Sequence, residues 1–136
     1  MDAVVEATRP PDGTLDAEAS RQAIRNALSD LLGEHSDVDL LNLDQAQREF
    51  VVERYAAYDV FQRFMLDIGQ HLSDKAPSAS AGLARLEQVR SYIRETIASS
   101  FRAIRQAGES MSSANVRNVV ANALADSVAV FESYLP

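Results

Sequence analysis

The stretch from Asp44 to Ser73 constrains the fold more than any other part of the chain. Its apolar residues recur at steps of three and four, which places their side chains on one face of a helix. These residues are Val51, Tyr55, Tyr58, Phe61, Met65, Ile68 and Leu72, and a second stripe consists of Phe50, Phe61, Phe64 and Ile68. A helix of about thirty residues is roughly 45 Å long. The pattern therefore predicts the spine of a small bundle, with Phe61 buried where both stripes meet.

Three further segments show the same periodicity. The four helices are predicted near residues 15–32, 44–73, 83–107 and 113–135. Short connections make successive helices antiparallel neighbours. The predicted fold is all-α, a bundle of four main helices with a long central helix. Pro10 and Pro11 precede it in a turn-forming sequence, so residues 1–13 are predicted to be irregular and residues 14–136 to form a single helical domain.

Capping residues predict where these helices begin and end. For the central helix, Asn42 with Gln45 and Asp44 with Gln47 are equally good capping boxes. Serine caps are expected for the last two helices at Ser78 or Ser80 and at Ser112 or Ser113. Gly33 and Gly108 are expected to end the first and third helices. Gly69 interrupts the central helix and indicates either close helix packing or the start of fraying.

Charged residues restrict the classes of partner. The formal net charge is −7, which argues against a nucleic-acid-binding protein, because phosphate backbones are held by clustered Lys and Arg. Residues 82–107 are locally basic, and this helix is expected to lie against acidic neighbours. Asp59 and Arg63 are four residues apart and are expected to pair on the solvent face of the central helix.

The chain contains no cysteine, which excludes disulfides and thiolate chemistry and fits a reducing cytoplasm. The first thirteen residues lack the basic and apolar regions of a signal peptide. No apolar run is long enough for a membrane span. The expected location is therefore cytoplasmic, without membrane contact.

No residue pattern predicts catalysis. Asp67 and His71 are spaced as neighbours on a helix, but one carboxylate and one imidazole are too few for a metal site, and His35 stands alone. Phosphate-binding glycine loops are absent. We therefore expect no catalytic, cofactor-binding or metal-binding residue and no enzyme activity.

The width of the apolar surface on the central helix predicts an interface instead. In a bundle of this size, apolar residues left over after packing should form an exposed patch, and such patches mark interfaces. The Arg-rich face of the third helix is the next candidate. The predicted partner-binding residues are Val52, Tyr55, Tyr58, Arg90 and Arg94.

Two stretches carry a resemblance to one family. Residues 10–16, PPDGTLD, run into a helix with Arg21 and Ala23, and residues 50–69 end in RFMLDIG. Both resemble the C-terminal helical region of the QatB family, a component of Qat anti-phage defence systems. The resemblance covers residues 10–96. The Gly/Ser-rich N-terminal portion of that family is missing, which suggests an isolated C-terminal domain.

The resemblance implies a non-enzymatic subunit that works with an ATPase, a QueC-like enzyme and a TatD-like nuclease. The favoured hypothesis is a protein-interaction module that docks to a defence-system enzyme, such as the QueC-like partner. The alternative is a small helical enzyme or ligand-binding bundle with an unrecognised pocket. Homo-oligomers remain compatible with both hypotheses.

Overall fold

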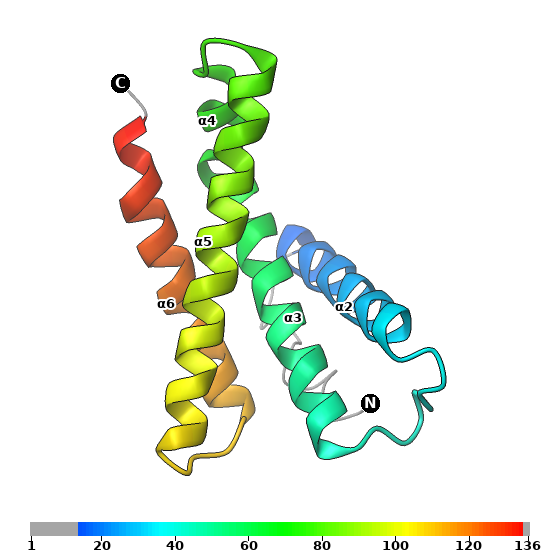
Figure 1. Ribbon diagram of the computed structural model, residues 1–136. Helices are drawn as coiled ribbons and strands as arrows, with labels where there is room; N and C mark the ends of the chain where they lie inside the picture. Colours follow the sequence, from blue (N-terminus) through cyan, green and yellow to red (C-terminus); the bar gives the residue numbers. More distant parts are fainter. Residues whose placement is uncertain (1–13, 135–136) are drawn as a thin grey trace.

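The computed structural model describes residues 14–134, in which every regular element is a helix (Figure 1). The elements are α2 (Thr14–Glu34), α3 (Gln45–Phe64), the π-helical turn η1 (Met65–Gly69), α4 (Gln70–Asp74), α5 (Ala79–Gln106), α6 (Ser113–Phe131) and the 3₁₀ turn η2 (Glu132–Tyr134). The prediction of an all-α fold with four main helices is confirmed. The irregular segment predicted at residues 1–13 and the predicted last helical residue, 135, lie outside the described residues.

The predicted central helix is a continuous rod made of α3, η1 and α4. Its π-helical turn ends at Gly69, which is buried. A Cβ built on Gly69 would overlap Sδ of Met65. Gly69 therefore leaves room for the Met65 side chain within the wider turn. Gly69 is therefore packed against a side chain of its own rod, and the two interpretations of Gly69, close helix packing and fraying, both stay predictions.

The central rod has neighbours on more than one side. In Figure 1, α2 lies on one side of α3, whereas α5 and α6 lie on the other. An aromatic cluster joins α3, α5 and α6. The centroid of the Phe131 ring lies 6.0 Å from that of Phe64 and 5.7 Å from that of Tyr92, both in edge-to-face geometry. Such pairs add specific geometry to the apolar burial of the core.

The start of α3 is decided by Asp44 and Gln47. The Gln47 amide donates to Oδ1 of Asp44 at 2.8 Å, and the Asp44 amide donates to Oε1 of Gln47 at 3.0 Å. This reciprocal pair is a capping box. Ser78 and Ser112 cap α5 and α6 without the reciprocal bond, each Oγ accepting from the backbone amide three residues later.

Gly108 ends α5 as predicted, whereas the prediction for Gly33 is wrong. Gly108 has φ +73°, and its amide and that of Glu109 donate to the carbonyls of Arg105 and Ile104, the pattern of a Schellman motif. Gly33 lies inside α2, because the His35 amide still donates to the Leu31 carbonyl at 2.8 Å and continues the helical pattern.

Asp59 pairs with Arg63 as predicted, but its expected solvent-facing position is wrong. Its exposed fraction is 1%, because α2 crosses α3 here. Oδ2 accepts from Nε of Arg63 at 3.0 Å, and Oδ1 accepts from Oγ of Ser20 on α2 at 3.4 Å. Burial raises the pKa of Asp59 above 3.8, and the charge of Arg63 and hydrogen bonds with Arg63, Tyr55 and Ser20 partly oppose that shift.

The two glycines give a matched stability test. Gly33→Ala should raise the free energy of unfolding by up to about 1 kcal/mol, because Gly33 is helical and a Cβ meets nothing within 4 Å. Gly108→Ala should lower it by about 1 kcal/mol, because its φ is left-handed. Urea unfolding of both variants measures the changes, and effects of the same sign would contradict the assigned backbone conformations.

The raised pKa of Asp59 predicts a pH-dependent contribution to stability. Between the pKa of the unfolded chain, about 3.9, and the higher folded value, the folded protein binds the proton more readily. The contribution of Asp59 to the free energy of unfolding therefore increases as the pH falls through this range. Asp59→Asn removes this titration.

The stability of wild type minus that of Asp59→Asn should therefore rise as the pH is lowered from neutral towards about 4. Urea unfolding at several pH values measures this difference, and Asp67→Asn, at an exposed position of the same rod, is the control. A difference that stays constant or falls would contradict the assigned direction.

Candidate interaction groove

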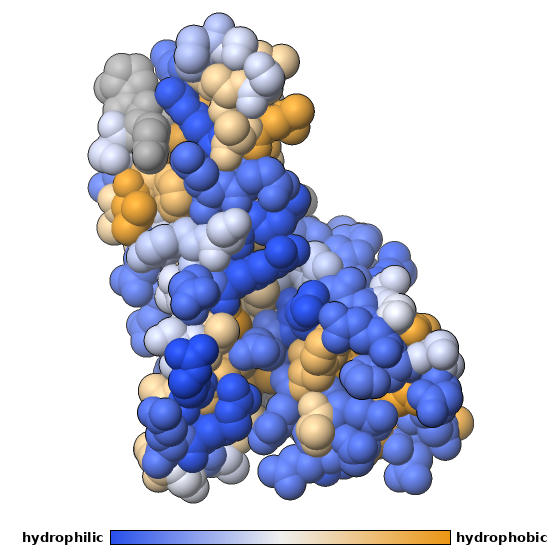
Figure 2. All heavy atoms as spheres, in the orientation of Figure 1, coloured by the Kyte–Doolittle hydropathy of each residue, from blue (hydrophilic) through white to orange (hydrophobic). Residues whose placement is uncertain are grey.

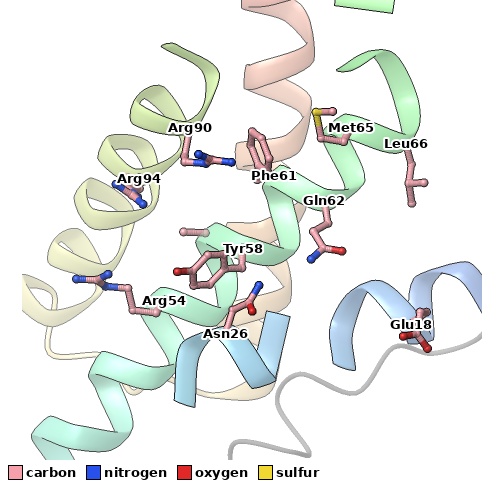
Figure 3. Close-up of a pocket in the computed structure, with 11 residues that line it drawn as sticks. Glu18, Asn26, Arg54, Tyr58, Phe61, Gln62, Met65, Leu66, Arg90 and Arg94 are labelled. Atoms are coloured by element: carbon pink, nitrogen blue, oxygen red, sulfur yellow. The ribbon is translucent and has the colours of Figure 1, made fainter. Parts of the chain in front are cut away.

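A groove of about 590 Å³ opens between α2, α3 and α5 (Figure 3). We call it the α2–α5 groove. Its apolar floor consists of Tyr58, Phe61, Met65 and Leu66, from α3 and η1. These positions follow one another at helical spacing, so they form a stripe along the central rod. Leu66 is 58% exposed, whereas Phe64, two residues earlier, is completely buried.

The wall that α5 contributes is basic. Arg90 and Arg94 lie one turn apart and face the groove (Figure 3). The Arg90 guanidinium lies over the Phe61 ring, 4.6 Å from its centroid, and donates to Oε1 of Glu87 at 2.6 Å. Arg94 is exposed and has no ion pair or hydrogen bond with any residue in the described range 14–134. It is therefore the groove cation most accessible to a partner.

The α2 side of the groove is polar and carries acidic groups. Asp30 of α2 accepts from the Tyr58 hydroxyl at 2.7 Å and from Arg54 at 3.2 Å. Arg54 also pairs with Glu34 at 3.4 Å, so its charge is offset by two carboxylates. Glu18 lies further along the same wall. Positive charge is thus exposed mainly on the α5 wall.

Tyr58 is a hydrogen-bond donor anchored at the centre of the groove. Desolvation raises the pKa of its hydroxyl, and the hydrogen bond to Asp30 and the charge of that carboxylate raise it further. The phenol therefore keeps its proton at neutral pH and holds α2 against the floor. Figure 3 shows the Tyr58 ring between Arg94 of α5 and Asn26 of α2.

The structure brings together three of the five predicted partner-binding residues. Tyr58, Arg90 and Arg94 line the groove. The prediction of an exposed patch that includes Val52 and Tyr55 is wrong, because their exposed fractions are 7% and 4%. Tyr55 is covered where α2 packs, beside Ser20 and Asp59, and this burial raises its pKa.

The sequence interpretation missed the other eight residues that line the groove: Glu18, Asn26, Arg54, Ala57, Phe61, Gln62, Met65 and Leu66. The two stripes already contained Phe61 and Met65, but Phe61 was assigned to the core. Its ring is instead half-buried and faces Arg90. The helical spacing of the apolar residues does not indicate which of the two stripes a neighbouring helix will cover.

The described residues contain neither a metal cluster nor a membrane-spanning helix. Over residues 14–134, no three His, Cys, Asp or Glu side chains gather as a metal site would require. Within that range, no helix combines the length and apolarity needed to cross a bilayer. The face seen in Figure 2 is largely hydrophilic, and its hydrophobic areas are small and separate.

Comparisons with known proteins give one family match. A family model described as "Qat anti-phage system associated protein QatB" matches residues 1–131. This range extends beyond the resemblance seen at residues 10–96 in both directions. No curated protein and no solved structure matches the chain.

Two phenylalanines of the central helix test the position of the groove. Phe64→Ala should lower the free energy of unfolding by about 3–5 kcal/mol, because the ring is fully buried. Phe61→Ala should cost clearly less, since the ring of Phe61 is only partly buried and lines the open groove. Urea unfolding compares the two variants. A Phe61→Ala variant as destabilised as Phe64→Ala would place Phe61 in the core.

Proposed function

Because the chain belongs to the QatB family of Qat anti-phage system associated proteins, we propose that it is a non-catalytic subunit that docks onto an enzyme of that defence system. The partner that we propose is the QueC-like enzyme, and the location is the cytoplasm. The docking surface is the α2–α5 groove, in which Tyr58, Arg90 and Arg94 make contact. Membranes and nucleic acids take no part in this docking.

The observation that carries the proposal is an apolar floor open to solvent between polar walls. Leu66 is more than half exposed, and Phe61 and Met65 lie beside it. Partner surfaces bury such a centre and leave the charged rim wet. Aromatic and Arg side chains supply most of the binding energy in interfaces of this type. The floor and the α5 wall contain both.

The chemistry of the groove supports binding rather than catalysis. Its guanidinium groups are donors only. Tyr58 retains its proton, because its pKa is raised, and its hydroxyl donates a hydrogen bond to Asp30. Asp30 in turn is occupied by Tyr58 and Arg54. These groups hold ligands in place, and we assign the chemical step to the partner enzyme.

The volume of the groove favours a second candidate function, the binding of a small molecule. About 590 Å³ lies within the range of ligand pockets, roughly 300–1,000 Å³. Native mass spectrometry of the purified domain separates the two candidates. A small molecule that stays bound to the wild type and is lost from Leu66→Asp would favour ligand binding.

Co-purification with the other subunits of the same Qat system tests the docking proposal. The wild-type chain should retain the QueC-like enzyme, and Leu66→Asp should lose it, because the charge would be buried against an apolar contact. Leu83→Asp is the matched control, since Leu83 is 67% exposed and does not line the groove.

Circular dichroism must first show that both variants keep the helical content of the wild type. Wild-type protein that retains none of the other subunits would refute the docking proposal. Retention that Leu66→Asp and Leu83→Asp reduce equally would place the interface elsewhere on the surface.

A further inference from the structure

We propose that the α2–α5 groove receives an amphipathic helix of the partner, with acidic residues along the side that faces α5. The apolar stripe of this helix lies on Phe61, Met65 and Leu66. Amide or basic residues follow its other side, towards α2. This inference rests on the proposed docking function and specifies the chemistry of the segment that docks.

The shape of the groove favours a helix as its occupant. α2 and α5 each pack on α3, but they make no extensive contact with one another. The residues of α3 and η1 that line the groove run from Arg54 to Leu66, and these twelve residue steps measure roughly 18 Å along the helix. About three turns of a docked helix cover that length. Such a helix would fill the space between α2 and α5.

Hydrogen bonding also favours a helix over an extended peptide. The groove is built entirely from helices, whose backbone groups are paired internally, so it offers no strand edge. An extended peptide would bury its own N–H and C=O groups on an apolar floor without partners. Within a helix these groups are already satisfied, and only side chains need to match the groove.

The charges of the two walls set the chemistry of the occupant. Docking would remove water from Arg94, which has no ionic partner in the part of the chain that the structure describes. A desolvated charge is costly unless an opposite charge meets it. A carboxylate placed beside Arg94 satisfies this requirement.

The opposite wall repels the same carboxylate. Glu18 on this side is already paired with Arg21 at 3.2 Å, whereas the two carboxylates of Asp30 and Glu34 share the single charge of Arg54. An acidic residue placed beside Asp30 and Glu34 would therefore meet net negative charge. The acidic side of the docked helix consequently faces α5, and this asymmetry fixes the orientation of its apolar stripe.

Charge reversal on α5 tests the proposed pairing. Arg94→Glu should raise the dissociation constant for the co-purified enzyme about tenfold or more. Arg94→Lys keeps the positive charge and should retain most of the affinity. Arg102→Glu makes the same charge change on an exposed part of the same helix outside the groove. Its affinity should stay within about twofold of the wild type, because surface charges outside an interface are screened by salt.

Site-specific crosslinking identifies the docked segment. The chain has no cysteine. A benzophenone maleimide therefore labels only the cysteine that is introduced for the experiment. Glu18→Cys, at the groove, should crosslink a helical segment whose acidic residues flank an apolar stripe. Glu109→Cys is the control, with the same charge change at an exposed position beyond α5. Its crosslinking yield should be clearly lower.

The outcomes distinguish the inference from the docking proposal. If no subunit of the system is retained by the wild type, both are refuted. If the enzyme is retained but Arg94→Glu and Arg102→Glu bind equally well, only the acidic pairing is refuted. Crosslinks to an extended or basic segment, or to a second copy of this chain, would refute the helix as the occupant.

Discussion

The fold depends on α3 being packed by helices on two sides, with no extensive contact between α2 and α5. α2 covers one side, and α5 and α6 cover the other. The first contact includes the buried carboxylate of Asp59 with Ser20 of α2, and the second includes the rings of Phe64 and Phe131. With α2 and α5 held apart, a third stripe of α3 stays open to solvent, and this stripe is the floor of the groove.

The polar contact beneath α2 controls specificity more than stability. Placing Asp59 in the interior has a desolvation cost, which its pairing with Arg63 and its hydrogen bond with Ser20 partly offset. Sliding α2 along α3 would leave the carboxylate without the hydroxyl that donates to it. The bond from Tyr58 to Asp30 fixes the same helix nearer its C-terminal end. These two contacts therefore set the position of the α2 wall of the groove.

A groove with one basic wall suits a subunit that must select a partner within a defence system. In the proposed docking, the apolar floor would provide area for binding. The charge of Arg94, which has no ionic partner among residues 14–134, would disfavour segments without a matching carboxylate. The net charge of the chain is −7, so this positive wall is a local exception on an acidic protein. Membership of the QatB family suggests that the partners to be selected are other components of the Qat system.

The four helices and the end of α5 at Gly108 could be predicted from the sequence alone, because they depend on neighbours within a few residues. The sequence left two candidates for the cap of each of the last three helices, and only the folded chain selected Asp44, Ser78 and Ser112. Tertiary structure alone decided that Val52, Tyr55 and Asp59 are buried and that Phe61 faces the groove. Periodicity gives the angular position of each side chain around its own helix. The crossing of α2 over α3 decides which of these side chains are buried and which are exposed to solvent.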